Sequence, residues 1–89
     1  MNFEFDVHKS ESNRRKHGIG FSAAQALWDD SDRIDIPART DDEPRFMIIG
    51  RIEGHVWSAV ITYRGEKVRI ISVRRARRKE ITIYESEGL

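Results

Sequence analysis

The fold of this chain is decided by residues 45–74, RFMIIGRIEGHVWSAVITYRGEKVRIISVR. The stretch contains three apolar runs rich in β-branched and aromatic residues, and this is the composition of β-strands. Only Glu53-Gly54 and Arg64-Gly65 separate the runs, so each strand has to turn back on the one before it. Residues 45–74 therefore predict a β-meander of antiparallel strands.

The segment before the meander predicts one short strand and two helices. NFEFD, residues 2–6, alternates apolar and polar side chains as a half-buried strand does. Asp6 is an N-cap residue for a polar helix, VHKSESNRRKH, that ends at Gly18. Ser22 is expected to cap a second helix, SAAQALWDD, at residues 22–30. A tight GIGF turn would join the two helices.

The remaining segments complete an α+β domain. Alternation around Ile34 and Ile36 predicts a further strand, and RARRKEITIYESE, residues 75–87, favours a C-terminal helix. The predicted order is β-α-α-β-β-β-β-α in a single domain, residues 1–89. This order indicates helices packed against one face of an antiparallel sheet. A chain of 89 residues forms only one modest core, so function is expected on a surface or in a groove.

The net charge of +1 conceals an asymmetry between the two parts of the chain. Residues 1–63 contain 8 Lys/Arg and 11 Asp/Glu, a balance of −3, whereas residues 64–89 contain 8 and 4, a balance of +4. Such asymmetry favours a polyanion or an acidic protein as partner. The chain has no cysteine, no leader-like N-terminus and no run of ~18 apolar residues, so we expect a cytoplasmic protein without a membrane span.

Basic residues concentrate in RRARRK, residues 74–79, directly after the last predicted strand. Guanidinium groups bind phosphate well because their donors are planar, always charged and bidentate. The alternative is a solvated helix face on which Arg77 pairs with Glu80. Composition alone leaves both interpretations open.

Strand alternation separates the basic residues of the last strand into two sets. It places Arg74 on one face of residues 66–74, with Lys67 and Arg69 on the other. Arg64 is expected close to Arg74, because it lies near the turn of the same hairpin. Arg64 and Arg74 are therefore the first candidates for holding a reacting phosphate, and Lys67 and Arg69 for gripping flanking phosphates or supporting the structure.

Ordered sequence blocks distinguish the chain further: FEFD at residues 3–6, Asn13, Lys16-His17-Gly18, FSAA at 21–24, Glu43 with Arg45, RIISVRRA at 69–76, Lys79-Glu80 and Tyr84. In this pattern, over about residues 2–85, the chain resembles the BrnT family of ribonuclease toxins from bacterial type II toxin–antitoxin modules. Val73 stands where the family commonly has alanine, a difference on a strand that should matter little for chemistry.

The resemblance implies a compact RelE-like fold and an endoribonuclease that inhibits translation and needs no metal or other cofactor. It also implies a partner, a cognate BrnA-like antitoxin with a ribbon-helix-helix DNA-binding domain, in a toxin2–antitoxin2 heterotetramer. That complex would repress its own operon, so operator DNA would be reached through the antitoxin.

Metal-free RNA cleavage sets the roles that side chains have to fill. The neighbouring 2′-hydroxyl is the nucleophile, so the protein has to move protons and stabilise a dianionic phosphorane. Arg64 and Arg74 are candidates for the stabilisation, and His17 and Tyr84 for proton transfer. His17 has an equal alternative as a favourable charge at a helix end, Tyr84 has one in the core, and Glu80 is expected to orient an arginine. The residues expected to bind RNA are Lys16, Lys67, Arg69, Arg75, Arg77, Arg78 and Lys79.

The tryptophans and the acidic residues have structural interpretations. Trp28 and Trp57 recur at the period of their apolar elements and are expected in the core rather than as stacking platforms. The acidic stretch follows no recognised metal-ligand loop and is better explained by turns and caps. Its members are Asp29, Asp30, Asp32, Asp35, Asp41, Asp42 and Glu43.

Two other classes of function remain open from the sequence. A noncatalytic corepressor would hold DNA phosphates with the same arginines, and its binding would depend steeply on salt without turnover. A protein-interaction module would match its cationic surface to an acidic partner, and an antitoxin would cover the same residues.

Overall fold

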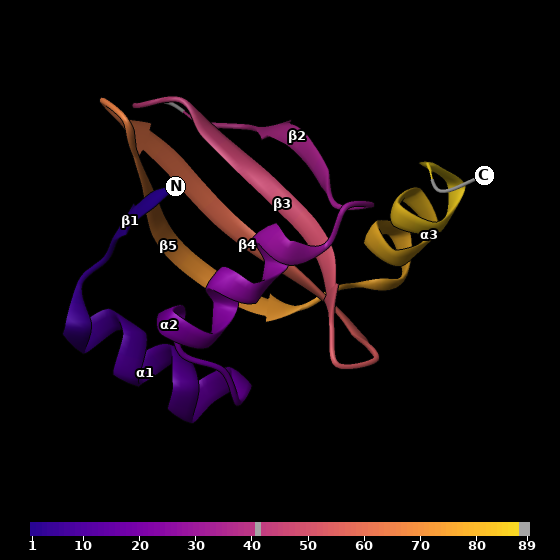
Figure 1. The fold of residues 1–89 in the computed structure, drawn as a ribbon, viewed down its shortest axis with the longest axis horizontal. Helices are drawn as coiled ribbons and strands as arrows, with labels where there is room; N and C mark the ends of the chain where they lie inside the picture. Colours follow the sequence, from indigo (N-terminus) through magenta and orange to yellow (C-terminus); the bar gives the residue numbers. More distant parts are fainter. Residues whose placement is uncertain (41, 88–89) are drawn as a thin grey trace.

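The computed structural model describes residues 1–40 and 42–87, and its helices and strands follow one another in the predicted order (Figure 1). The elements are β1 (Asn2–Glu4), α1 (Val7–His17), α2 (Phe21–Ala24), the 3-10 helix η1 (Gln25–Asp29), β2 (Ile34–Ala38), β3 (Arg45–Ile52), β4 (His55–Arg64), β5 (Lys67–Arg75) and α3 (Arg78–Glu87).

The sheet has five strands in the order β1-β5-β4-β3-β2. The four strands from β2 to β5 form the predicted antiparallel meander. The prediction of a wholly antiparallel sheet is wrong at one edge, because β1 pairs with β5 in parallel. After β1 the helices carry the chain across the sheet to its far edge, and the meander then returns to β1 with β5 running in the same direction (Figure 1). Alternation within a three-residue strand does not reveal its direction.

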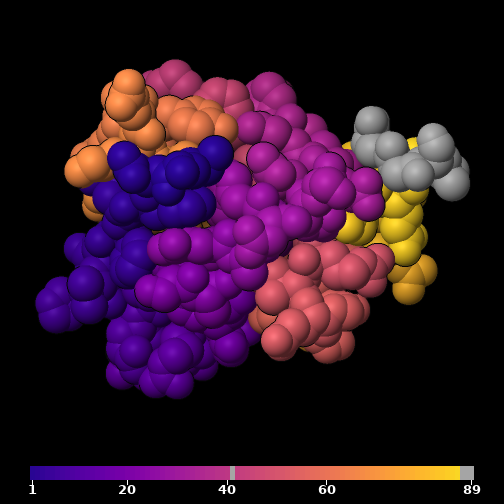
Figure 2. Space-filling view, viewed as in Figure 1, coloured from indigo at the N-terminus to yellow at the C-terminus, as the bar shows by residue number. Residues whose placement is uncertain are grey.

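Helices cover both faces of the sheet, which corrects the prediction that they pack on one. The first face carries the main core, where Phe21 of α2 and Leu27 of η1 cluster with residues such as Ile48 of β3, and α1 lies against β5. Figure 2 shows the atoms of these N-terminal elements covering much of this side. Ile49, the next residue of β3, belongs to a smaller core with Tyr84 of α3. Neighbouring strand residues point to opposite faces, so α3 packs on the second face.

A β-bulge interrupts the pairing of β4 with β5. Val60 pairs with Ser72, whereas the following residue, Ile61, pairs with Ile70. Ile71 therefore has no counterpart on β4, as expected of the extra residue in a bulge. From this point on, the alternation of β5 is shifted by one residue.

The shift places two arginines on the same face. Ile70 and Val73 both lie in the main core although they are three residues apart. Arg69 and Arg74 consequently share the second face, where the prediction had separated them. An extra residue that is itself apolar leaves no mark in the hydrophobic pattern, so alternation alone could not locate the bulge.

The ends of α1 are as predicted. The Asp6 carboxylate accepts a hydrogen bond from the Lys9 backbone N–H at 3.0 Å. The helix ends at Gly18, whose φ of 83° is the left-handed conformation that glycine adopts most easily.

The start of α2 differs from the prediction. The helix begins at Phe21 and its N-cap is Gly20, so Ser22 lies within it. Ser10 of α1 supplies the missing acceptor, because its Oγ accepts a hydrogen bond from the Phe21 N–H at 2.8 Å. A side chain from a neighbouring helix thus replaces the expected local cap.

A buried asparagine joins α1 to the free edge of β5. The Nδ2 of Asn13 donates to the carbonyl oxygens of Val73 and Ile19, each at 2.8 Å. Its Oδ1 accepts from the Val73 N–H at 3.1 Å. Since β1 pairs only with residues 67–69, the Asn13 carboxamide takes the place of a strand neighbour for Val73.

We expect Asn13→Ala to lower the free energy of unfolding by roughly 2–4 kcal/mol, since each buried backbone group left unpaired costs ~1–3 kcal/mol. Urea denaturation followed by circular dichroism measures the change. Asn2→Ala is the matched control, because Asn2 is exposed on β1. Equal stability of the two variants would contradict a structural role for the buried amide.

Candidate functional site: a cationic sheet face

The second face of β4 and β5 carries a row of basic side chains, which we call the cationic face. Arg64 pairs across the strands with Lys67, Arg69 follows two residues later, and Arg74 lies near the end of β5. Arg69 and Arg74 are partly buried, whereas Arg64 and Lys67 are exposed. The row therefore runs along the hairpin from its turn toward α3.

Arg64 and Arg74 lie at opposite ends of this row. Arg74 pairs with Ser58, which precedes Arg64 by six residues on β4. At roughly 3.3 Å per strand residue, the two positions are about 20 Å apart. The expectation that they converge on one phosphate is wrong, because β4 and β5 extend well beyond the turn near which Arg64 lies.

Two members of the row have loose carboxylate partners. An Nη2 of Arg64 lies 3.9 Å from Glu43, and an Nη1 of Arg69 lies 3.9 Å from Glu4. Ion pairs of this length on accessible side chains contribute little to stability. Both guanidinium groups are thus free to exchange their carboxylate for another anion.

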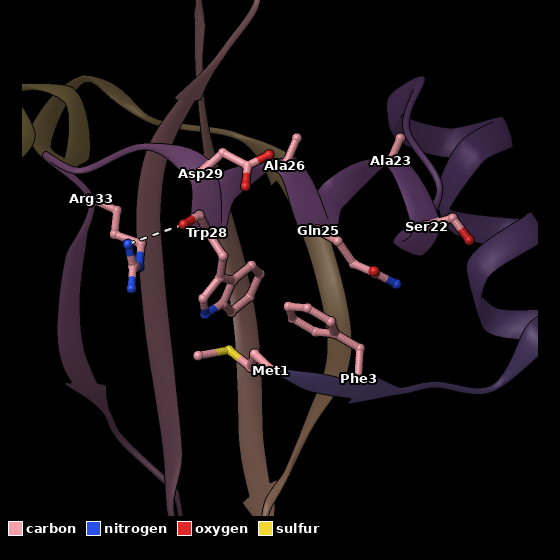
Figure 3. A pocket seen from close by; sticks show the side chains of 9 residues that line it. All are labelled: Met1, Phe3, Ser22, Ala23, Gln25, Ala26, Trp28, Asp29 and Arg33. Atoms are coloured by element: carbon pink, nitrogen blue, oxygen red, sulfur yellow. Dashed lines mark hydrogen bonds between the residues drawn. The ribbon is translucent and has the colours of Figure 1, made fainter.

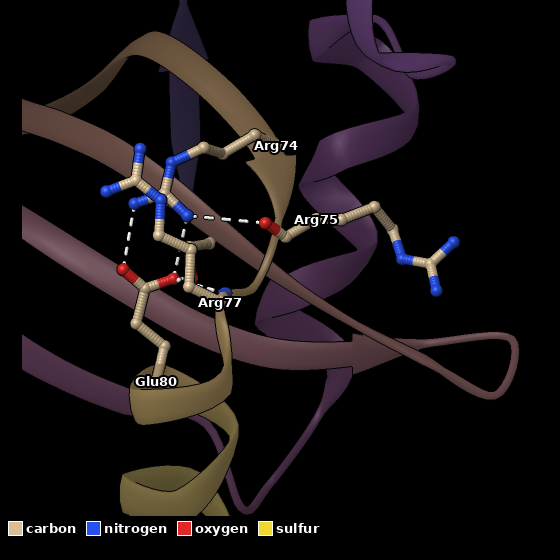
Figure 4. Close-up of polar contacts among 5 residues, drawn as sticks. Arg74, Arg75, Arg77 and Glu80 are labelled. Carbon is tan, nitrogen blue, oxygen red and sulfur yellow. Dashed lines mark hydrogen bonds and ion pairs between the residues drawn. The ribbon is translucent and has the colours of Figure 1, made fainter.

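Arg74 instead forms a tight pair with Glu80 of α3 (Figure 4). Nη1 and Nη2 of Arg74 donate to the two carboxylate oxygens at 2.7 and 2.8 Å. Ser58 Oγ and the Arg77 N–H also donate to Oε1 of Glu80, at 2.8 and 2.9 Å. These contacts join β4, β5 and the first turn of α3.

The pair leaves one edge of the Arg74 guanidinium open. Its Nη1 donates both to Glu80 and to the Arg75 carbonyl, the latter at 3.3 Å. A guanidinium has five N–H donors, and within residues 1–40 and 42–87 the Nε–H and one Nη2–H of Arg74 have no partner. Two adjacent donors on a fixed planar group are suited to bidentate contact with a phosphate.

Glu80 holds its charge at neutral pH. The hydrogen bonds from Arg74 lower the pKa of the Glu80 carboxyl to about 2, and those from the Arg77 N–H and Ser58 act in the same direction. The same contact raises the pKa of Arg74. Glu80 therefore suits the orientation of an arginine and not the exchange of a proton.

Tyr84 is directed away from the row. Its side chain is buried, and its hydroxyl donates to Asp30 at 2.6 Å. The Arg51 guanidinium lies 5.7 Å from the centre of its ring. Burial and the hydrogen bond to Asp30 raise the pKa of the Tyr84 hydroxyl. In this structure Tyr84 anchors α3 to the sheet.

The other predicted site residues are dispersed. Lys16 and His17 are exposed at the end of α1, whose neighbouring segment, Ile19 and Phe21, enters the main core on the first face. The sheet thus separates His17 from Arg74. The remaining predicted RNA-binding residues are all exposed: Arg75 at the end of β5, Arg77 in the link to α3, and Arg78 and Lys79 in the first turn of α3.

Three of the acidic residues contact other elements through their carboxylates: Asp30, Asp35 and Glu43. Asp30 is the clearest case, because its carboxylate accepts hydrogen bonds from Tyr84 and from the N–H groups of Arg51 and Asp32. Among the described residues, no three His, Asp or Glu side chains are grouped as metal ligands. Asp41, a member of the acidic stretch, lies outside the described residues.

A pocket of about 590 Å³ lies away from the cationic face (Figure 3). Phe3 and Trp28 form its apolar floor, and Met1 and Gln25 line it further. Arg33 also lines the pocket, and its Nη1 donates a hydrogen bond to the Trp28 carbonyl oxygen at 3.2 Å. Since it is lined by none of the predicted site residues, we do not assign the candidate site to it.

Sequence reasoning missed two polar residues of β4 that support the row. Ser58 and Thr62 are both buried, at 1% and 2% exposure. Ser58 binds Glu80, and Thr62, which pairs with Arg69, donates to the Pro44 carbonyl at 2.7 Å. The sequence feature that could have revealed them is a pair of hydroxyl side chains on one face of an otherwise apolar strand.

These features define a mixed α+β domain with a row of arginines along one sheet face. A family model of BrnT, the ribonuclease toxin of type II toxin–antitoxin systems, matches residues 5–80, and the chain belongs to this family. The matched region includes β2 to β5, the cationic face and Glu80, and it ends before Tyr84. No curated protein matches the chain. Within the described residues, no helix is long and apolar enough to cross a membrane.

The Glu80 contact makes stability depend on pH. Because its pKa is about 2 in the folded chain and 4.5 in the unfolded one, Glu80 contributes stability above pH 4.5 that is lost as pH falls toward 2. Glu80→Gln should lower the unfolding free energy at pH 7 by on the order of 3 kcal/mol and flatten its pH dependence below pH 5. Urea denaturation from pH 2 to 7 measures both, with exposed Glu85→Gln as control. Parallel pH profiles for the parent and Glu80→Gln would refute the assignment.

Proposed function

We propose that this chain is a metal-independent endoribonuclease that inhibits translation, and that RNA lies along the cationic face. The observation that supports this most is the open donor edge of Arg74, on a guanidinium held in place by Glu80. The phosphates of a single strand would follow the row from Arg74 to Arg69 and onward to the hairpin turn. The loose partners of Arg69 and Arg64 would be displaced as the backbone binds.

In this proposal Arg74 acts on the reacting phosphate. The 2′-hydroxyl loses its proton and attacks the adjacent phosphorus, and the bond to the 5′-oxygen breaks as that oxygen gains a proton. Charge accumulates on the phosphorane oxygens, where the two free N–H groups of Arg74 would stabilise it. Such stabilisation costs no reorganisation, because the guanidinium is already oriented. Arg64, at the other end of the row, is reassigned to a flanking phosphate.

Proton transfer is left without an assigned residue. His17 is separated from Arg74 by the sheet, and the Tyr84 hydroxyl is bound to Asp30. Neither has the hydrogen-bond reach that a general acid or base needs in this arrangement. Rearrangement on binding RNA would be needed before either could act.

We further infer the partner and its regulation from membership of the family. The antitoxin would be a BrnA-like protein with a ribbon-helix-helix domain, and two toxins and two antitoxins would form a heterotetramer in the cytoplasm that represses its own operon. The fold would be RelE-like. An acidic antitoxin segment along the cationic face would neutralise the toxin by occupying the RNA path.

Purified antitoxin-free protein should fragment total RNA in excess EDTA. Arg74→Lys preserves a charge for Glu80 but loses the planar fork, so we expect cleavage to slow by about 10²–10³-fold, the cost typical of losing one preorganised donor. Arg39→Ala, an exposed arginine outside the row, should cleave at the parent rate. Cleavage rates measured with a fluorescent RNA compare both variants with the parent, after circular dichroism has shown that the variants fold.

The outcomes separate the classes of function. Cleavage abolished by EDTA and restored by a divalent cation would refute metal independence. Salt-dependent binding of RNA or DNA without turnover, on free RNA and with ribosomes, would identify a noncatalytic corepressor instead.

Co-expression with the antitoxin should give a complex whose mass, measured by light scattering, equals two copies of each chain. RNA cleavage should be lost in this complex, and binding to operator DNA should require the antitoxin. A complex that still cleaves RNA at the parent rate would show that the antitoxin does not cover the cationic face.

A further inference from the structure

A pocket of about 370 Å³ lies on the first face, at the end of the sheet where β5 meets α3. Its walls come from the end of α1 at Gly18, from Ile52 and His55 on either side of the β3–β4 turn, and from Trp57 of β4. The volume falls near the lower end of the ~300–1,000 Å³ found for small-ligand pockets. We call it the Trp57 pocket.

Trp57 is the platform of this pocket. The sequence indicated a core residue, but the side chain is only half-buried and one part of it lines the pocket. Arg75 pairs with Trp57 across the strands, and its guanidinium carbon lies 5.5 Å from the ring centre. Arg75 is exposed and has no carboxylate partner among the described residues.

Basic residues adjoin the pocket at Gly18 and at Trp57. The last turn of α1 consists of basic residues and leads directly into Gly18. His55 adds an imidazole to the lining, and Glu53 is the one carboxylate among the residues that form the pocket. An aromatic surface with an arginine beside it suits a ligand with a π-face and an adjacent anion.

We propose that the Trp57 pocket binds one unpaired base of the RNA substrate, stacked on Trp57, with the adjoining phosphate on Arg75. This proposal rests on the proposed function and extends it to a second contact region. Stacking on an aromatic residue is the usual way in which proteins hold single-stranded RNA, since every base has a π-face. A base inside a duplex is already stacked and cannot enter, so the pocket selects single-stranded RNA.

The end of β5 connects the pocket with the cationic face. Arg74 and Arg75 are consecutive, and their side chains leave the strand in opposite directions (Figure 4). One RNA strand that passes round this end of the sheet would place a phosphate on Arg74 and the next unpaired base near Trp57. The pocket would thus fix which phosphate reaches Arg74.

Fluorescence of Trp57 tests the proposal directly. In a Trp28→Phe background Trp57 is the sole tryptophan, and a short uncleavable 2′-O-methyl oligouridylate should quench it saturably. An abasic oligomer of the same length should not quench it. Because the probe cannot be cleaved, the result does not depend on turnover.

Binding of the same probe, measured by anisotropy, gives a second readout. Stacking is worth roughly 5–150-fold in affinity per base, so we expect Trp57→Leu to weaken binding about tenfold. Trp28→Leu is the matched control, since Trp28 is also half-buried against the main core and lies outside the pocket. Arg75→Ala should weaken binding more than Arg39→Ala, which removes the same charge elsewhere. Melting curves establish that each variant is folded.

Unchanged Trp57 fluorescence, or equal affinity of Trp57→Leu and Trp28→Leu, would overturn the pocket proposal even if the chain cleaves RNA. Quenching by a peptide that contains an aromatic residue, without quenching by RNA, would also overturn it and indicate a protein ligand. Quenching by RNA in a chain that cleaves none would support the pocket and refute the proposed ribonuclease activity. The two proposals can thus fail separately.

Discussion

The Asn13 carboxamide fixes the position of α1 relative to the end of β5, and both candidate surfaces depend on that end. Past Arg69, β5 has no strand neighbour on its outer side, so its backbone groups need other partners. Asn13 supplies a donor and an acceptor to Val73, and it also holds the Ile19 carbonyl. An asparagine is suited to this because one planar group offers both functions in the geometry of a backbone amide. The next two residues, Arg74 and Arg75, are thereby held in place.

A second contact fixes the same strand end from the opposite face. Glu80 binds Arg74, Ser58 and the start of α3 with one carboxylate, so the orientation of the guanidinium and the docking of α3 are parts of one network. Burying a single charge there would be unfavourable, whereas a paired and hydrogen-bonded carboxylate is tolerated. The result is an arginine that is rigid before any ligand arrives. Rigidity of this kind is what electrostatic stabilisation of a transition state requires.

Much of the fold could be predicted because it depends on local signals. The hairpin turns, the Asp6 cap and the Gly18 terminus each follow from a few neighbouring residues, and the order of elements follows from them. The parallel pairing of β1 and the packing of α3 on the second face depend on contacts between distant segments. The bulge at Ile71 is local, but its extra residue is apolar like its neighbours, so strand alternation conceals it. That one residue decides which arginines share a face.

The candidate site was harder to predict than the fold for the same reason. Sequence reasoning gave the right kind of residue, because a dense run of arginine is visible without a structure. It treated RRARRK as one basic cluster, although strand geometry divides the run. Arg74 points to the cationic face and Arg75 to Trp57, while Arg77, Arg78 and Lys79 are exposed on the link to α3 and in its first turn. Two consecutive arginines in a strand point to opposite faces, so they cannot easily bind the same phosphate. A ligand that uses both has to pass round the strand end, and a flexible single strand of RNA can do so where a duplex cannot.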